Sequence, residues 1–328
     1  MVCCHAIMKA LLTGITGNLG YEISLALAQR GVTLIPCVRP GKTGILFSHP
    51  TKFQQIVEYD LTEAADIEFS DKVDCIIHCA GVVHFRDVGN KNEQMMRKVL
   101  ALAKKLKVPV HFISTAFVYR PHEDGRSFNN SYEQDKFNAE QLLIKSGVPY
   151  GIFRPSVLTG HSRTGEIRNF SGFYLIVRAF ISAIRAAKAK NQVLRFPRML
   201  GESNMVPVDQ AAESIGNAIQ RNQLEILYVT NPVPPRSEWV LDETLDFFNI
   251  RDSFKIIDIS FQEFGNLNLT EEEAALYRFS GHFSAYWSTE YAFPPSICTR
   301  NLIDHDYLVK ALTFFRDSEH FSHGQKTH

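Results

Sequence analysis

Short apolar runs alternate with amphipathic stretches along the first half of the chain. Strands are predicted at residues 9–13, 33–38, 53–59, 73–79, 108–114 and 150–154, and the fourth, at 73–79, is almost wholly apolar, as a strand buried on both faces should be. Between them, residues 19–30, 92–107 and 131–146 have the spacing of helices, and Gly31 follows the first of these as a C-cap. This alternation predicts an α/β fold, a Rossmann-type doubly wound parallel sheet.

The rhythm changes after Pro155. A polar loop at 160–169 precedes four predicted helices, at 170–190, 207–221, 237–248 and 270–279, the last opened by a Thr-Glu-Glu-Glu capping signal. A strand is predicted at 224–230, a turn at 231–236 and a frayed polar tail at 318–328. We therefore expect a cofactor-binding domain at 1–154, a smaller C-terminal substrate-binding part at 155–317 with some segments returning to the sheet, and a flexible tail.

Composition narrows the class of protein. The 328 residues carry 35 Lys and Arg against 35 Asp and Glu, which argues against a nucleic-acid protein that relies on bulk positive charge. The longest apolar stretch, at 170–184, is broken by Arg178 and is too short to span a bilayer. Six cysteines without a C-x-x-C pair indicate reduced thiols and a cytoplasmic location, and no metal site is expected. Residues 1–10 contain no long apolar core, so we expect no signal peptide there, and the natural start is open between Met1 and Met8.

A glycine-rich loop lies between the first predicted strand and the first predicted helix. Gly14 makes the tight turn, Gly17 allows a pyrophosphate to approach the backbone, and Gly20 allows close packing of the helix. The helix N-terminus then offers amide donors and a positive dipole to phosphate. The loop predicts dinucleotide binding rather than a merely structural turn. The expected contacts are Gly14, Thr16, Gly17, Asn18, Leu19 and Gly20.

The T-G-x-x-G-x-x-G spacing of this loop resembles that of the extended short-chain dehydrogenase/reductase superfamily. Further motifs of that family follow in the same order, so that the resemblance covers roughly residues 9–231: Asp60-Leu61, His78-Cys79-Ala80-Gly81, Ser114 to Tyr119, and Tyr132 with Lys136. The resemblance implies that Asp60 and Leu61 lie near the adenine, and that the cofactor is also lined by Ala80, Gly81, Ser114, Lys136, Pro155 and Val157.

Some of these residues have simpler explanations. Asp60 and Asn92 could each cap a helix, and His78 could be a satisfied core histidine rather than part of the cofactor wall. Pro155 and Val157 could mark no more than the exit of a strand.

Tyr132 and Lys136 are four residues apart, so that they share one face of a predicted helix. A phenol of ordinary pKa near 10 is a poor base at neutral pH, and a neighbouring ammonium would favour the phenolate. The family resemblance implies that Lys136 also holds the nicotinamide ribose and that the Thr115 hydroxyl holds the reacting oxygen. The predicted catalytic set is Thr115, Tyr132 and Lys136, against the alternative of a chance pairing on an exposed helix. The stretch from Thr115 to Tyr132 is shorter than is usual in the family.

The end of the second predicted strand indicates which nicotinamide cofactor binds. Asp or Glu there would hold the ribose of NAD, whereas Arg accommodates the 2′-phosphate of NADP. The chain has no acidic residue between Glu22 and Glu58, and the strand runs into Arg39 with Lys42 close behind. NADP(H) is therefore favoured and NAD(H) stays possible; the alternative is that both cations are only solvated.

The second half resembles the thioester-reductase, or male-sterility-like, branch of the family. The resemblance rests on three segments, at 160–165, 206–209 and 230–234. It implies NADPH-dependent reduction of an acyl thioester, on coenzyme A or a carrier protein, to an aldehyde or alcohol. The apolar stripe of residues 170–184 could wall an acyl tunnel or be ordinary core, and the proposed substrate contacts are His84, Phe85 and Ser156.

Other classes of function stay open at this point. They are a carbonyl reductase, a sugar-nucleotide epimerase or dehydratase that uses NAD, and a non-catalytic NADP-sensing protein. Partners beyond a small-molecule substrate are not expected, except a second copy in a homodimer formed through the helices at 92–107 and 131–146.

Overall fold

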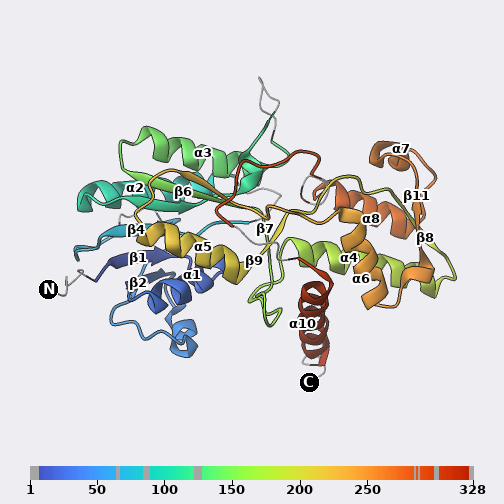
Figure 1. The fold of residues 1–328 in the computed structure, drawn as a ribbon, viewed down its shortest axis with the longest axis horizontal. Coiled ribbons are helices and arrows are strands. Elements are labelled where there is room, and N and C mark those ends of the chain that lie inside the picture. Colours follow the sequence, from blue (N-terminus) through green and yellow to red (C-terminus); the bar gives the residue numbers. More distant parts are fainter. Residues whose placement is uncertain are drawn as a thin grey trace. The chain divides into compact units, whose positions relative to one another are not determined.

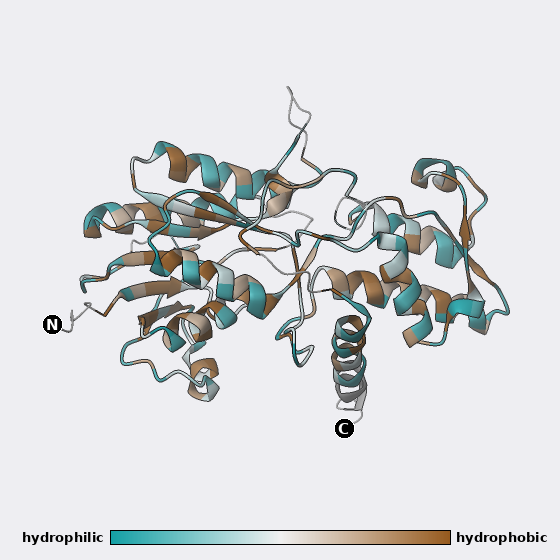
Figure 2. Ribbon diagram, in the orientation of Figure 1, coloured by the Kyte–Doolittle hydropathy of each residue, from teal (hydrophilic) through white to brown (hydrophobic). Residues whose placement is uncertain are grey.

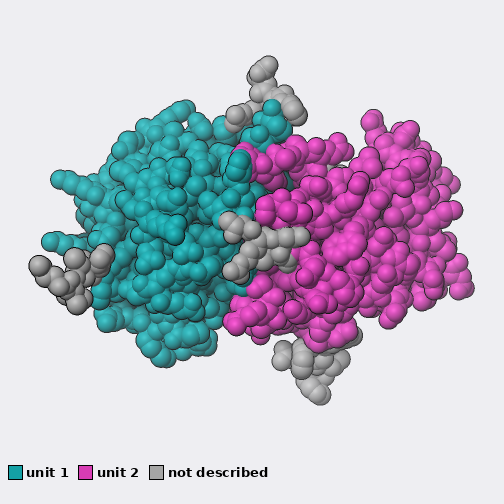
Figure 3. Space-filling model, in the orientation of Figure 1, with its two compact units in different colours: residues 1–156, 208–230, 295–298 teal, residues 157–207, 231–294, 299–328 magenta. Residues whose placement is uncertain are grey.

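The computed structural model describes residues 7–63, 67–83, 89–121, 128–283, 286, 289–298 and 303–324 (Figure 1). The chain forms two compact units, coloured separately in Figure 3. Unit 1 consists of residues 1–156, 208–230 and 295–298, and unit 2 of residues 157–207, 231–294 and 299–328. The chain therefore leaves unit 1 after the sixth strand of its sheet and returns to it twice.

Unit 1 is built on a seven-stranded sheet in which every pairing is parallel. The spatial order is β10-β6-β5-β4-β1-β2-β3. The chain adds β2 and β3 on one side of β1 and the later strands on the other side, which confirms the predicted doubly wound Rossmann-type sheet. The strands are β1 (Lys9–Thr13), β2 (Thr33–Val38), β3 (Val57–Glu58), β4 (Cys75–His78), β5 (Val110–Ile113), β6 (Tyr150–Pro155) and β10 (Ile226–Val229).

Two pairs of helices cover this sheet. Helix α1 (Asn18–Gln29) packs against α5 (Val208–Gln220), and α2 (Lys91–Leu106) packs against α3 (Ser131–Lys145), as Figure 1 shows. The α2–α3 side buries alternate strand residues, among them Leu11, Ile35 and Ile76, together with apolar side chains of both helices. This alternation explains why the strands are almost wholly apolar, since residues on both faces are covered.

The third strand is shorter than its apolar run predicts. Only Val57–Glu58 pairs with β2, although the run begins at residue 53. Phe53 instead packs its ring 4.9 Å from the ring of His49, which also contacts Tyr21. Local aromatic packing therefore replaces sheet pairing at this end of the run.

Unit 2 has two small parallel ladders surrounded by helices. Strand β7 (Val157–Thr159) pairs with β9 (Met205–Pro207), and β8 (Leu194–Pro197) pairs with β11 (Phe254–Ile257). The helices are α4 (Phe173–Ala189), α6 (Ser237–Phe247), α7 (Phe261–Gly265), α8 (Glu271–Gly281) and α10 (His305–Gly324). Figure 2 shows apolar residues concentrated along one side of α4, where Tyr174, Phe180 and Ile184 are at most 2% exposed.

Two features of unit 2 test the sequence predictions directly. The capping signal before α8 is confirmed, because the Thr270 hydroxyl accepts from the Glu273 amide and the Glu273 carboxylate accepts from the Thr270 amide. The expectation of a tail that frays from Ser318 is wrong at its start, because α10 continues to Gly324. Buried apolar residues such as Leu308, Leu312 and Phe315 anchor this helix in the core of unit 2.

None of the helices within the described ranges combines the length and apolar character that crossing a bilayer requires. In the same part of the chain, His, Cys, Asp and Glu side chains do not gather in groups of three that could hold a metal ion.

Candidate cofactor and catalytic site

The glycine-rich loop leaves no room for side chains. Gly14 has a φ of 76°, and a Cβ there would lie 2.4 Å from the backbone nitrogen of Ala80. A Cβ on Gly20 would lie 2.1 Å from the carbonyl oxygen of Gly14. Both glycines are therefore required by backbone contacts, the first between the loop and β4 and the second between the loop and α1.

The start of α1 is arranged for an anion. Gly17 is its N-cap, so that no side chain caps the helix, and its first turn contains no acidic residue. The Gly17 amide donates to the Gly14 carbonyl oxygen at 3.0 Å, which closes the turn. A helix terminus with this loop fits the pyrophosphate of a dinucleotide, as the sequence predicts.

Thr13 and His78 attach the loop to β4. The Thr13 hydroxyl accepts from the Ala80 amide at 3.2 Å and lies 2.8 Å from Nδ1 of His78. His78 is 1% exposed, and its Nε2 has no hydrogen-bond partner in the part of the chain that the structure describes. Burial, reinforced by the Lys136 ammonium, lowers the pKa of His78 to about 3. His78 is thus a neutral core residue that supports the loop.

Asn92 connects the end of β4 to α3, and the interpretation of Asn92 as a helix cap is wrong. Asn90 occupies the N-cap position of α2, whereas Asn92 lies within the helix. The Asn92 side chain accepts from the Val82 amide at 3.0 Å and donates to an Asp135 oxygen at 2.9 Å. Asp135 also accepts from two backbone amides in the first turn of α2, at 2.8 and 3.1 Å. These contacts fix the segment after β4 against the helix that carries Tyr132 and Lys136.

The three predicted catalytic residues come together in unit 1. Thr115 follows β5, and its hydroxyl is hydrogen-bonded to the phenol of Tyr132 on α3. Lys136 lies one turn further along α3, where its Nζ donates to the Ile113 carbonyl oxygen at 2.9 Å. Each of the three side chains belongs to a residue at most 8% exposed. The motif is therefore not a chance pairing on an exposed helix face.

The electrostatics of this group differ from the expectation. Burial raises the pKa of Tyr132, and the hydrogen bond from Thr115 offsets this only in part. Burial also lowers the pKa of Lys136 to about 8, opposed by Cys79, Asp135 and Glu140. The predicted activation of the phenol as a base is therefore not found; without cofactor, Tyr132 is a protonated phenol that is suited to donate a proton.

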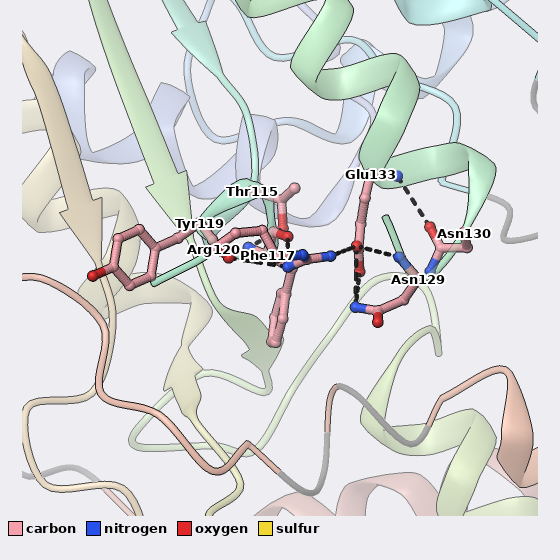
Figure 4. A network of polar contacts seen from close by, with 7 residues as sticks. All are labelled: Thr115, Phe117, Tyr119, Arg120, Asn129, Asn130 and Glu133. Carbon is pink, nitrogen blue, oxygen red and sulfur yellow. Dashed lines mark hydrogen bonds and ion pairs between the residues drawn. The ribbon is translucent and has the colours of Figure 1, made fainter. Parts of the chain in front are cut away.

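Figure 4 shows a polar network that joins the segment after Thr115 to the first turn of α3. Arg120 forms an ion pair with Glu133, the residue after Tyr132, and both side chains are buried. Asn129 contributes its amide and its side chain to the same carboxylate. Sequence reasoning missed this network, because nothing in the local pattern shows that Arg120 and Glu133 face each other.

Buried hydroxyls at the ends of two neighbouring strands also fit a cofactor. Ser114 follows β5 and Ser156 follows β6, and the Oγ of each is buried without a hydrogen-bond partner among the described residues. Unsatisfied buried hydroxyls are costly unless a ligand pairs with them. Pro155 ends β6 in unit 1, whereas Val157 opens β7 in unit 2. His84 and Phe85 lie outside the described residues.

The end of β2 carries both cations and carboxylates. Arg39 and Lys42 are exposed, as a 2′-phosphate site requires. Strand pairing places Glu58 opposite Val38, and the Glu58 carboxylate accepts from the Gly41 amide at 3.2 Å. The acid-free stretch of sequence around Arg39 therefore does not correspond to an acid-free surface.

Asp60 and Leu61 follow β3, the edge strand that pairs with β2. Asp60 accepts from the amide and hydroxyl of Thr62, at 2.9 and 2.7 Å. These bonds lower the pKa of Asp60, and Arg39 adds a smaller effect. Within the described residues, Asp60 thus closes a turn and does not cap a helix, while Leu61 is 6% exposed.

Comparisons with known proteins agree with this geometry. Residues 57–215 match the family model described as "Male sterility protein". A linear gramicidin synthase of Brevibacillus parabrevis is 31% identical over 140 residues, which are 38% of this chain and only 2% of that protein. The chain thus corresponds to a small part of this much longer relative.

Two solved structures show the same fold over nearly the whole chain. The terminal R domain from the myxalamid PKS-NRPS biosynthetic pathway has a TM-score of 0.72 at 20% identity, covering 97% of this chain and 92% of that one. A thiolation-reductase di-domain from an archaeal non-ribosomal peptide synthetase has a TM-score of 0.68 at 16% identity, covering 96% and 76%.

Proposed function

Because the chain is an NAD(P)-binding member of the extended short-chain dehydrogenase/reductase superfamily, similar to its thioester-reductase branch, we propose that it reduces an acyl thioester with NADPH. The observation that carries the proposal is the buried, protonated Tyr132, hydrogen-bonded to Thr115 in the unit that holds the dinucleotide loop. Reduction of a carbonyl needs a proton donor of this kind, since the oxygen becomes an alkoxide as hydride adds.

The proposed chemistry assigns a task to each catalytic side chain. NADPH supplies the hydride that adds to the carbonyl carbon. The hydroxyls of Thr115 and Tyr132 stabilise the developing oxyanion, and Tyr132 gives it a proton, which leaves a hemithioacetal. The C–S bond of the hemithioacetal then breaks, and the hydroxyl proton passes to the leaving sulfur. Lys136, whose pKa is about 8, is largely charged at neutral pH and favours the transient phenolate. The net step converts a thioester, NADPH and a proton to an aldehyde, a free thiol and NADP⁺.

The preference for NADPH over NADH rests on Arg39 and Lys42. Both cations are exposed beside the end of β2, where a 2′-phosphate would need them. Glu58 is engaged by the Gly41 amide, and Asp60 by Thr62. The two nearby carboxylates are thus held by backbone groups, which supports a phosphate-binding role for the cations.

Unit 2 supports an acyl substrate. Between α4 and α6 it contains a cavity of about 40 Å³, lined mainly by apolar side chains such as Phe173, Val177, Phe180 and Leu241. This lining suits an acyl chain better than a nucleotide sugar, but a cavity of this size must widen before it can hold such a chain. We propose a carrier-protein or coenzyme A thioester as the substrate, in keeping with the thiolation-reductase pairing named for the archaeal structure.

The test is a substrate panel that follows two products together. The protein is incubated with NADPH and acyl-coenzyme A, acyl-carrier thioesters, aldehydes or nucleotide sugars, while NADPH absorbance and free thiol are recorded. Release of thiol matched to loss of NADPH, abolished in Tyr132→Phe, is the expected result.

Each other outcome identifies another function. Oxidation of NADPH by aldehydes alone would indicate a carbonyl reductase. Turnover of a nucleotide sugar without net cofactor oxidation would indicate an epimerase. Tight NADPH binding without any turnover would favour the sensing protein.

A further inference from the structure

The ion pair of Arg120 and Glu133 is buried more deeply than a structural surface pair would be. Their side chains are 8% and 0% exposed. The other end of the Arg120 guanidinium donates to the carbonyl oxygens of Phe117 at 2.7 Å and Tyr119 at 3.0 Å. Arg120 therefore holds the backbone of η2 (Ala116–Val118), the turn that directly follows Thr115.

Glu133 makes the matching contacts on the side of α3. Its carboxylate accepts from the Asn129 amide at 3.0 Å and from the Asn129 side chain at 3.1 and 3.2 Å. Its own amide donates to the N-cap Asn130 at 3.0 Å. Glu133 thereby fixes the first turn of α3, in which Tyr132 is the neighbouring residue.

We propose that Arg120 and Glu133 are positioning residues, whose ion pair sets the register between the hydroxyls of Thr115 and Tyr132. The pair spans the short connection between the turn and the helix, 13 residues apart in sequence (Figure 4). A buried ion pair adds little stability over an apolar pair, but loss of one partner leaves an uncompensated charge. A site that needs one fixed geometry would explain why this ion pair is buried although it adds little stability. The role in turnover rests on the proposed function; the role in geometry does not.

The charge environment of Tyr132 makes the proposal testable. Its phenol is affected by the Glu133 carboxylate on its own helix and by Cys79 at the end of β4, with the Thr115 hydroxyl as hydrogen-bond partner. Lys136 lies one turn away on α3 and is itself influenced by Asp135 and Glu140. Of these groups, only Glu133 is joined to Arg120.

Two variants should change the phenol in opposite directions. Glu133→Gln leaves the Arg120 cation unpaired near Tyr132 and should lower the pKa of the phenol. Arg120→Met leaves the Glu133 carboxylate unpaired and should raise it. The same unpaired charges act on Lys136, whose loss of charge sets the alkaline limb of kcat/KM for NADPH-dependent reduction. This limb should therefore move down in the first variant and up in the second, by about half a pH unit or more. Both variants should lose on the order of tenfold or more in kcat, because small misplacements of reacting groups are expensive, while the Kd for NADPH stays within about twofold.

Glu273→Gln is the matched control. Glu273 is also 0% exposed and bonded to an arginine, Arg195, but it belongs to unit 2. Its loss should lower the melting temperature and leave the pH profile in place. If Glu133→Gln and Arg120→Met behave like this control, the pair is structural only and the proposal is wrong.

Amide hydrogen exchange tests the same idea without turnover. Either variant at Arg120 or Glu133 should accelerate exchange in residues 116–118 and 131–134 together, since the pair connects both segments. Faster exchange in only one segment would overturn the proposal. If the wild-type protein turns over no thioester, but the variants still show faster exchange in both segments, the proposed function is rejected and the positioning role of the ion pair stands.

Discussion

Two buried histidines should make unit 1 sensitive to mild acid. His111 on β5 is 0% exposed, and within the described ranges neither ring nitrogen has a hydrogen-bond partner. Burial lowers its pKa from the ordinary value of 6.5 to about 4. His78 on β4 has its pKa lowered to about 3 by burial and by Lys136. Both rings are therefore neutral in the folded chain at neutral pH, and protonating them lowers its stability.

The size of the effect follows from linkage. Below pH 6.5 the unfolded chain binds protons that the folded chain refuses, so that stability falls as the pH falls toward the folded-state pKa values. Between pH 7 and pH 5, a shift from 6.5 to 4 or below costs about 2 kcal/mol for each histidine. Wild-type protein should therefore lose about 4 kcal/mol of unfolding free energy over this range.

Urea unfolding at pH 7 and pH 5, followed by circular dichroism, measures this loss. His111→Leu removes one titrating ring that makes no hydrogen bond, so that its loss on acidification should be about half that of wild type. His305→Asn is the control, because His305 is exposed and its pKa is raised by Glu243. An equal loss in His111→Leu and wild type would refute the role of the buried ring.

Three further predictions concern the cofactor and catalytic groups. Arg39→Ala should weaken NADPH binding by about 1.5–3 kcal/mol, the value of a hydrogen bond to a charged group. Fluorescence titrations with both cofactors measure this, and NADH binding should hardly change. Equal losses of affinity for NADPH and NADH would contradict the preference for NADP. Tyr132→Phe should lower kcat by roughly 10²–10⁴ with nearly unchanged cofactor affinity, whereas Lys136→Ala should damage both, and full activity in Tyr132→Phe would reject the catalytic assignment. Gly20→Ala places a methyl group against the Gly14 carbonyl oxygen and should abolish NADPH binding in the same titration, while the nearby Gly31→Ala, which meets no atom within 4 Å, tests backbone strain alone.

The parts of the fold that depend on local pattern could be predicted from the sequence. The strands of unit 1 are short apolar runs because they are covered on both faces, and β1 and β2 have the predicted bounds. The glycines of the loop are required by backbone contacts within one strand–turn–helix unit. The proposed catalytic residues Tyr132 and Lys136 lie on one helix, so that their shared face follows from helix periodicity alone.

Contacts between distant segments could not be predicted in this way. Glu58 comes next to the end of β2 only because β3 pairs with it, a consequence of sheet order. Arg120 and Glu133 meet across a connection whose path the sequence does not specify. The ladders of unit 2 have only three or four residues per strand, too few for an alternating pattern to be recognised.

Dimer formation through α2 and α3, like a cytoplasmic location, stays a prediction. The exposed positions of α2 include Lys91, Arg97, Lys104 and Lys105. A seam formed there would have to bury or pair these cations, and the acidic partner Glu93 is already paired with Arg97.

The protonation of Tyr132 and Lys136, the proposed catalytic pair, favours one direction of reaction. An alcohol oxidation begins with removal of a proton, which requires a phenolate, whereas a carbonyl reduction ends with donation of a proton from a phenol. Burial raises the pKa of Tyr132 and lowers that of Lys136 to about 8, so that both effects disfavour the charged forms in the absence of ligand. The ground state is thus a neutral phenol beside a cation that loses its proton readily, which is the starting state for reduction. We therefore expect reduction to be nearly independent of pH below about 8 and to decline as Lys136 loses its charge, whereas oxidation of the matching alcohol should need alkaline conditions.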